Sequence, residues 1–211
     1  MLKFLIADDH PLYREALKGA LKTEFDRVTY LESDSFNSTV NVIRNNRRLN
    51  LLLLDLNMPG CDNFYGLLRI KQTYPDLPIA VVSATDSIDV ISQVLEFGAD
   101  AFIPKTTPTT DLIIALKTVL DGEKWIPEHI KKELVEVNSD TLEIAQQVKE
   151  LTPKQFQVLR FIKQGMMNKQ IADHLSVTEA TVKAHISMIF KRLNVKSRTQ
   201  ILVAIEKLQL D

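Results

Sequence analysis

Features that would point to other classes of protein are scarce in this sequence of 211 residues. Its single cysteine, Cys61, excludes a disulfide bond within the chain. No apolar run approaches the roughly 20 residues that a membrane-spanning helix needs, and runs such as Leu51–Leu54 are only as long as a strand. The first residues show no long apolar core followed by a cleavage site, so no signal peptide is predicted. We therefore expect a cytoplasmic protein with no membrane partner.

The net charge of −1 conceals an uneven distribution along the chain. Residues 1–150 carry 16 Lys and Arg against 23 Asp and Glu, whereas residues 151–211 carry 10 against 4. The first part is therefore acidic and the second part basic. Such an asymmetry favours nucleic-acid binding by the basic part. A solvated basic helical surface is the alternative explanation of the charge.

Short apolar runs alternate with helical patterns through about the first 120 residues. Five strands alternating with five helices predict a parallel sheet covered by helices on both faces. The fold class is therefore α/β, and we favour the doubly wound, flavodoxin-like (βα)5 arrangement with strand order 2-1-3-4-5. That order would bring the ends of the first and third strands next to each other.

Polar side chains stand at the ends of four of these apolar runs. Asp8 and Asp9 follow the first run, Asp55 follows the third, Ser83 follows the apolar part of the fourth and Lys105 follows the fifth. Open α/β sheets place their sites at the edge where the strands end. Clustered carboxylates repel one another, and Mg²⁺ prefers such oxygen ligands. In this arrangement the carboxylate of Asp55 could attack a phosphoryl group and form an acyl phosphate. The hydroxyl of Ser83 and the ammonium of Lys105 could bind the phosphoryl oxygens.

Each of these residues also has an explanation that involves no site. Asp8 and Asp9 could cap the following helix, Ser83 could be a turn or cap residue, and Lys105 could be a solvated surface lysine. Asp55 is harder to explain in this way, because a carboxylate after four leucines is costly unless it is solvated or paired. The occurrence of all five residues at strand ends favours a phosphoryl-transfer site.

Four segments of the first part resemble the receiver domain of two-component response regulators, over about 120 residues. These segments are Ile6–His10, Leu54–Gly60, Val82–Ala84 and Ile103–Lys105. The resemblance implies that the aspartate of the second segment, Asp55, accepts a phosphoryl group from a sensor histidine kinase or a small phosphodonor.

The resemblance also assigns roles to the neighbouring residues. It implies that Asp9 and Asp55 bind Mg²⁺ together with the backbone carbonyl of Asn57, and that Asp8 acts mainly through a bound water. Ser83 and Lys105 would sense the phosphorylated state. Phe102 stands where the family has an aromatic switch residue, and plain packing in the core is the alternative for it.

A charged segment follows the first part of the chain. Residues 123–150 are neither Gly/Ser-rich nor Pro-rich, so a flexible linker is disfavoured. Two short helices interrupted near residues 138–140 are predicted instead. We assign residues 1–122 to a first domain, 123–150 to a partly helical linker and 151–211 to a second domain.

The second domain shows four helical patterns and is predicted to be small and all-α. Thr152 and Gln155, with Pro153 between them, form a capping box at its start. A tight turn near 176–178 joins its second and third helices, as in a helix-turn-helix. The third helix, about residues 179–193, has an apolar stripe on one side. The opposite, outer face is formed by Lys183, Ala184, Ser187 and Lys191. A four-helix interaction module with ordinary surface lysines is the alternative.

The second domain resembles the LuxR-type (NarL/FixJ class) DNA-binding domain in the segments Leu151–Pro153, Asn168–Ala172, Thr181–His185 and Leu193–Thr199. This implies that three residues face the base edges of double-stranded DNA: Lys183, Ala184 and Ser187. It implies phosphate contacts from six others: Thr178, Thr181, His185, Lys169, Lys191 and Arg198. A histidine satisfied beside the core is the alternative for His185. The resemblance further implies a homodimer on DNA, formed through the last helix, and makes RNA polymerase a candidate partner.

These features favour a transcription regulator controlled by phosphorylation, with Mg²⁺ as its cofactor. An aspartyl-phosphate phosphatase is the enzymatic alternative, but Asn57 stands where such an enzyme needs a second acid/base aspartate. We therefore expect no enzymatic activity beyond self-phosphorylation at Asp55. A regulator that works without phosphorylation is a third hypothesis, against which the complete acidic set argues. His129 and His174 show no zinc-ligand spacing.

Overall fold

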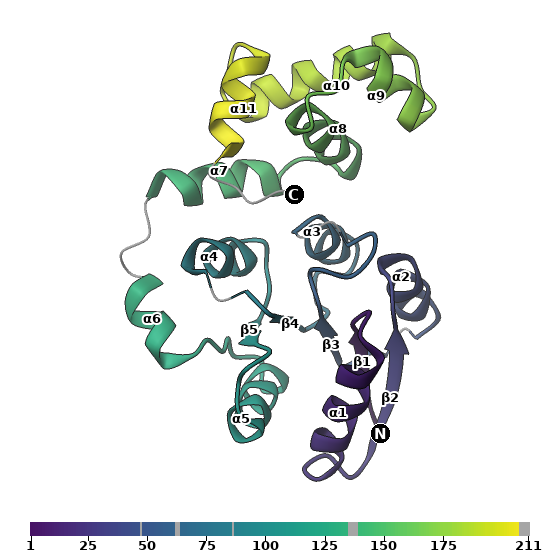
Figure 1. Ribbon diagram of the computed structural model, residues 1–211, viewed down its shortest axis with the longest axis vertical. Coiled ribbons are helices and arrows are strands. Elements are labelled where there is room, and N and C mark those ends of the chain that lie inside the picture. The colour runs from purple at the N-terminus through teal and green to yellow at the C-terminus, as the bar shows by residue number, and fades with distance from the viewer. Residues whose placement is uncertain (47, 62–63, 86, 135–138, 207–211) are drawn as a thin grey trace. The chain divides into compact units, whose positions relative to one another are not determined.

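A computed structural model describes residues 1–46, 48–61, 64–85, 87–134 and 139–206 (Figure 1). The chain divides into two compact units, Met1–Val137 and Asn138–Asp211. The segment expected as a linker is shared between them, since α6 (Glu128–Leu134) belongs to the first unit and α7 (Ser139–Lys149) to the second. Residue 138, where the interruption was expected to begin, lies outside the described residues.

The first unit contains a sheet of five parallel strands in the order β2-β1-β3-β4-β5. This confirms the predicted order 2-1-3-4-5. The strands are β1 (Leu2–Ala7), β2 (Val28–Ser33), β3 (Leu51–Leu54), β4 (Ile79–Ser83) and β5 (Ala101–Pro104). The register places Ala7 opposite Leu54 and Ser83 opposite Pro104, so the strands end at a common edge.

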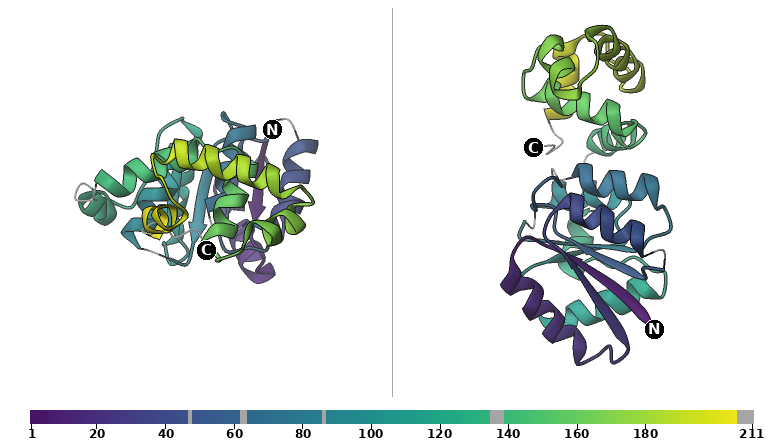
Figure 2. Two further views of the ribbon diagram at one scale, coloured as in Figure 1. Left: turned by 90° about the horizontal axis from the view of Figure 1, so that it is seen from above. Right: turned by 90° about the vertical axis from the view of Figure 1, so that its right-hand side faces the viewer.

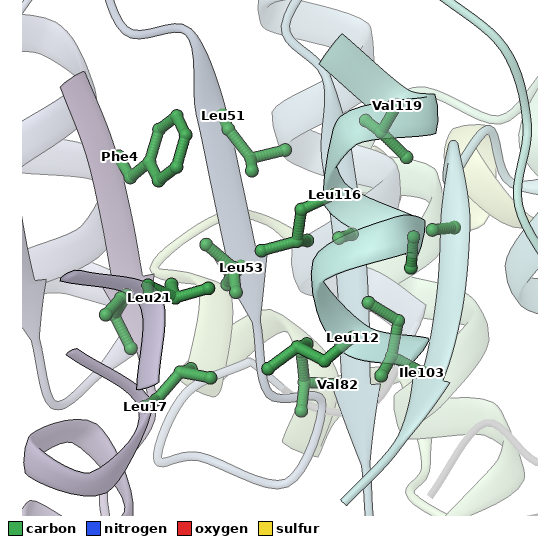
Figure 3. Close-up of a cluster of buried hydrophobic side chains, with 14 residues drawn as sticks. Phe4, Leu17, Leu21, Leu51, Leu53, Val82, Ile103, Leu112, Leu116 and Val119 are labelled. Atoms are coloured by element: carbon green, nitrogen blue, oxygen red, sulfur yellow. The ribbon is translucent and has the colours of Figure 1, made fainter. Parts of the chain in front are cut away.

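Helices cover both faces of this sheet (Figure 1 and Figure 2). One face carries α1 (Pro11–Lys22) and α5 (Thr109–Leu120), and the other carries α2 (Phe36–Asn45), α3 (Phe64–Thr73) and α4 (Ile88–Glu96). Alternate strand residues point to the first face. There they form a cluster with Leu17, Leu21, Leu112, Leu116 and Val119 of its two helices (Figure 3). Burial of this cluster holds the strands, and hence their ends, in place.

The loop between β3 and α3 is held by a close approach at Gly66. The amide of Gly66 donates a hydrogen bond to the carbonyl of Cys61 at 2.7 Å. A Cβ atom at position 66 would lie 2.3 Å from Cys61 Sγ and 3.0 Å from the Cys61 carbonyl oxygen, so a larger residue would require Cys61 to shift. Glycine is therefore required here to position the segment that follows the third strand.

The segment after α5 returns to the edge of the sheet. Trp125 forms an isolated parallel bridge with Ala101 of β5. Its amide donates to the carbonyl of Asp100 at 2.9 Å, and its carbonyl accepts from the amide of Phe102 at 3.3 Å. The chain that leads into α6 is thus attached to the last strand, a contact that hydrophobic periodicity did not predict.

The second unit is all-helical in its described residues. After α7 come α8 (Pro153–Lys163), α9 (Asn168–Leu175), α10 (Glu179–Arg192) and α11 (Arg198–Glu206), as predicted for a small all-α domain. Thr152 and Gln155 form the predicted capping box. Ser176 adopts a left-handed conformation, with φ of 52°, at the turn between α9 and α10. The core contains buried residues from α8 to α11, among them Phe156, Ile171, Ile186 and Ile201.

Among the described residues, no helix combines the length and apolar character needed to cross a membrane.

Candidate functional site

Backbone hydrogen bonds bring the polar residues at the strand ends to one edge of the sheet. The amide of Asp55 donates to the carbonyl of Ala7 at 2.8 Å, and the amide of Lys105 donates to the carbonyl of Ser83 at 2.8 Å. Asp8 and Asp9 follow β1 directly. Because the ladder of the sheet continues one residue past the strands, the side chains expected to form a site do lie together.

An ion pair network at this edge is centred on Lys105. Its Nζ lies 2.7 Å from Asp8 Oδ2 and 2.8 Å from Asp55 Oδ2. The side chains of Asp8 and Asp55 are only 3% and 1% exposed. Burial alone would lower the pKa of Lys105, but its hydrogen bonds to Asp55 and Asp8 outweigh this and raise the pKa. The ammonium therefore stays charged and offsets the repulsion between two buried carboxylates.

The acidic residues also bring together a set of groups able to bind a metal ion. Ligand atoms of Asp8, Asp9, His10 and Asp55 all lie within 4.8 Å of one another. Asp9 Oδ1 is buried, and Nδ1 of the exposed His10 lies 2.8 Å from it. Three carboxylates gathered within 4.8 Å of one another suit a hard divalent cation, which prefers oxygen ligands.

His10 is more closely involved than sequence reasoning indicated. Its Nδ1 lies 2.8 Å from Asp9 Oδ1 and 3.1 Å from Asp8 Oδ1. Its amide donates to Asp8 Oδ1 at 2.8 Å. The imidazole of His10 is thus close to Oδ1 of Asp8, whereas Lys105 binds the other oxygen, Oδ2. Its position directly after the acidic pair was the only signal in the sequence.

The remaining residues expected at the site are close to Asp55 or to the strands that flank it. The amide of Asn57 donates to Asp55 Oδ1 at 3.1 Å, which fixes the carboxylate oxygen that Lys105 does not bind. Ser83 is buried, and its hydroxyl accepts a hydrogen bond from the amide of Thr85 at 3.2 Å. Phe102 is fully buried and lies opposite Val81 in the sheet.

Sequence reasoning missed one neighbour of this network. The Nζ of Lys105 lies over the ring of Tyr13, 4.8 Å from the ring centroid. Tyr13 stands in the first turn of α1, and burial raises the pKa of its hydroxyl. An aromatic residue at this place in the helix carries no signal by itself, because its partner lies at the end of a distant strand.

In the second unit, the residues expected to contact DNA bases lie on the exposed face of α10. Lys183, Ala184 and Ser187 are exposed, while Val182 and Ile186 on the opposite face are buried. The hydroxyl of Ser187 donates to the carbonyl of Lys183 at 3.0 Å. This hydroxyl is therefore engaged within its own helix, and the face presents two small side chains beside an ammonium.

The residues expected to contact phosphates have more varied surroundings. Thr178 caps α10, with its hydroxyl accepting from the amide of Thr181 at 3.1 Å. Lys169 and Lys191 are exposed, and His185 is half-buried. These positions leave both lysine ammonium groups accessible to an anionic partner.

Arg198 is partly committed to contacts within the unit. Its guanidinium donates to Asn168 Oδ1 at 3.4 Å and to the carbonyl of Met166. Burial lowers its pKa. Arg198 thus ties the start of α11 to the segment that begins α9, a structural role that its sequence position did not reveal.

Family comparisons agree with this division into two units. Residues 4–117 match the model for the response regulator receiver domain, and residues 149–205 match that for bacterial regulatory proteins of the luxR family. The chain is 36% identical over 209 residues to the glycerol metabolism activator of Pseudomonas putida, covering 97% of this chain and 95% of the relative. It is 31% identical over 199 residues to the nitrate/nitrite response regulator protein NarL of Escherichia coli K12, covering 93% and 91%.

A solved structure extends the likeness to the fold. RcsB from Salmonella enterica serovar Typhimurium, bound to promoter P1flhDC in the presence of phosphomimetic BeF₃⁻, matches with a TM-score of 0.58 and 25% identity. The match covers 99% of each chain. The receiver and luxR-family models match one unit each, and the two relatives match over more than nine tenths of their own length. The chain belongs to the family of two-component response regulators that combine a receiver domain with a LuxR-type helix-turn-helix domain.

Proposed function

We propose that Asp55 accepts a phosphoryl group from a sensor histidine kinase and that this controls dimerisation and DNA binding by the second unit. The observation that carries the proposal is the pairing of buried Asp55 with Lys105 beside two further aspartates. The relative RcsB was solved on a promoter with a phosphomimetic group, which supports the link between the two events. Such a regulator acts on the chromosome, in the cytoplasm.

The residues at the sheet edge fit Mg²⁺ as the cofactor of this step. Asp9 and Asp55 would hold the ion together with the backbone carbonyl of Asn57, and Asp8 would act mainly through a bound water. The ligand atoms of Asp8, Asp9 and Asp55, which lie within 4.8 Å of one another, support this assignment. When bound, Mg²⁺ would neutralise charge on the phosphoryl oxygens.

The transfer itself needs only groups of this chain and of the donor. A carboxylate oxygen of Asp55 forms a bond to phosphorus while the bond from phosphorus to the donor's leaving group breaks, and the electron pair goes to the leaving group. Lys105 is placed to bind a phosphoryl oxygen, and the Ser83 hydroxyl to bind another. Phe102, buried on the strand that ends at Lys105, is our candidate switch residue. We propose no catalytic turnover of an external substrate.

The output of the switch is binding of double-stranded DNA by a homodimer. We propose that α10 enters the major groove, where Lys183, Ala184 and Ser187 face the base edges. Phosphate contacts would come from the surrounding residues: Thr178, Thr181, His185, Lys169, Lys191 and Arg198. The exposed basic face of α10 supports this arrangement. RNA polymerase is a candidate partner at the promoter.

The experiment that tests the proposal is phosphorylation of the full chain by labelled acetyl phosphate and Mg²⁺. Asp55→Ala should abolish incorporation, because it removes the carboxylate that we propose to form the bond to phosphorus, which lies 2.8 Å from Lys105 Nζ. Asp26→Ala, at an exposed aspartate just before the start of β2, is the matched control and should incorporate normally. Persistent labelling of the Asp55→Ala protein would refute the assignment.

A second measurement tests the output. Phosphorylated wild-type protein should select DNA sequences from a random pool more strongly than the unphosphorylated protein. Equal selection by the two forms would support the regulator that works without phosphorylation.

A further inference from the structure

We propose that Tyr13 is a positioning residue for Lys105 during phosphoryl transfer and in the phosphorylated state. This inference rests on the proposed function, because it concerns what holds the lysine once Asp55 is modified. Tyr13 belongs to neither the acidic set nor the switch residues identified from the sequence.

Among the described residues, three groups contact the ammonium of Lys105. Two are carboxylates, Asp8 at 2.7 Å and Asp55 at 2.8 Å. The third is the ring of Tyr13, whose centroid lies 4.8 Å from Nζ. A cation within about 6 Å of an aromatic centroid is attracted by the negative face of the ring. The Lys105 side chain is only 18% exposed, so water screens this attraction less than at the surface.

The ring is held in place by the beginning of α1. The amide of Tyr13 donates to the carbonyl of His10 at 3.1 Å, in the turn that follows the acidic pair. The side chain packs against the core cluster beneath the sheet. Its position is therefore fixed by the beginning of α1 and by the core cluster, neither of which contains Asp55.

The three neighbours respond differently to the chemistry of the site. Phosphorylation joins an oxygen of Asp55 to phosphorus, and a divalent cation at the acidic set draws on the charge of Asp8. Both carboxylates then hold the ammonium less strongly. The ring of Tyr13 carries no net charge and offers no ligand oxygen in its face, so it neither competes for the cation nor repels the phosphoryl group. The ring of Tyr13 therefore still attracts the ammonium after phosphorylation. This contact keeps the ammonium at the sheet edge, where it can bind the phosphoryl oxygens.

This role depends on the face of the ring and not on the hydroxyl. Because burial raises the pKa of Tyr13, the hydroxyl is protonated near neutral pH and the ring is neutral. Phenylalanine offers the same aromatic face, whereas leucine fills a similar apolar space without a quadrupole. The two substitutions therefore separate positioning by the ring from plain packing.

The test measures the rate of labelling by acetyl phosphate in the full chain. Tyr13→Leu should slow labelling about fivefold, as expected for loss of a partly buried cation–π contact, and Tyr13→Phe should stay within about twofold of wild type. In a Lys105→Ala background, Tyr13→Leu should cause no further slowing, because its effect passes through the lysine. The Mg²⁺ concentration for half-maximal labelling should not change in Tyr13→Leu.

Tyr30→Leu is the matched control. Tyr30 is also a partly buried tyrosine packed against the same core cluster, and its ring contacts Phe4 and not the lysine. This variant should label at the wild-type rate. A wild-type rate for Tyr13→Leu, or an equal slowing of Tyr13→Leu with and without Lys105, would overturn the inference.

A measurement on the unmodified protein is independent of labelling. The ε-methylene protons of Lys105 should resonate upfield of ordinary lysines, because the carbon that bears them is bonded to Nζ, which lies over the ring, and Tyr13→Leu should remove this shift. They should stay upfield when BeF₃⁻ and Mg²⁺ are added. Ordinary chemical shifts in the wild type would overturn the inference, while absence of Asp55-dependent labelling with an upfield signal would refute the proposed function alone.

Discussion

The two units present their functional side chains in opposite ways. In the first unit, Asp8 and Asp55 are buried and share one ammonium. In the second unit, Lys183 and Lys191 lie on the exposed face of α10. The first site is a concentration of charge inside the fold, and the second is a solvated surface. The same kind of substitution should therefore have different consequences in the two units.

The difference determines whether a substitution at each site changes the stability of the fold or only the affinity for a partner. Breaking a buried ion pair leaves a charge without a partner, which destabilises the fold itself. Removing an exposed lysine changes the folded state little, and its cost appears only when DNA binds. Substitutions in the receiver site should therefore change the stability of the first unit, whereas substitutions of the exposed lysines of α10 should change DNA binding without changing stability.

The largest expected effect on stability comes from Lys105→Ala. It should lower the free energy of unfolding of the first unit by about 3 kcal/mol, because two buried carboxylates lose their shared cation. Urea titrations followed by far-UV circular dichroism would measure it. Added Mg²⁺ should stabilise this variant more than the wild type, since the ion supplies the missing positive charge.

Lys117→Ala is the matched control for that prediction. Lys117 pairs with Glu24, but its side chain is 52% exposed, so its loss should cost no more than about 1 kcal/mol. Equal destabilisation by the two substitutions would contradict the contrast between buried and exposed charges.

A smaller effect, on binding alone, is expected from Lys183→Ala. Specific DNA affinity should fall about tenfold, as for loss of one contact to a base edge, while the free energy of unfolding changes by less than about 0.5 kcal/mol. Fluorescence anisotropy on a selected DNA site would measure the affinity. Lys154→Ala, at an exposed lysine of α8, should bind normally. Unchanged affinity of the Lys183→Ala protein would remove this residue from the interface.

The smallest effect tests an exception to the contrast. Thr178 is exposed, yet its hydroxyl accepts a hydrogen bond that caps α10. Thr178→Ala should therefore lower the stability of the second unit by about 1 kcal/mol, and Thr178→Ser should retain most of it. Thermal unfolding of the full chain would compare them. If alanine is as stable as serine at this position, the cap contributes nothing.

Much of the fold followed from the sequence because the pattern of the first unit is unambiguous. Apolar runs separated by helical segments allow few parallel topologies, and the order of the strands was predicted correctly. The same topology explains why Asp8, Asp55 and Lys105 could be expected at one edge. The predicted capping box at Thr152 is also present, since it depends only on neighbouring residues.

Other features depend on side-chain directions that periodicity does not encode. Lys105 pairs with Asp8 as well as Asp55, and its ammonium lies over the ring of Tyr13. These partners are distant from Lys105 in the sequence. Arg198 donates to the carbonyl of Met166, before α9, and the Ser187 hydroxyl is used within its own helix. Each contact depends on the rotamer that a side chain adopts in the packed fold. A pattern of residue types therefore could not have specified it.

The bridge between Trp125 and β5 has a practical consequence. Trp125 is the only tryptophan in the chain, and it is hydrogen-bonded to the strand that contains Phe102 and ends at Lys105. Its fluorescence therefore reports from a single, known place next to the region that would rearrange. The protein carries its own optical probe, and the emission of this indole can follow the receiver in real time without an added label.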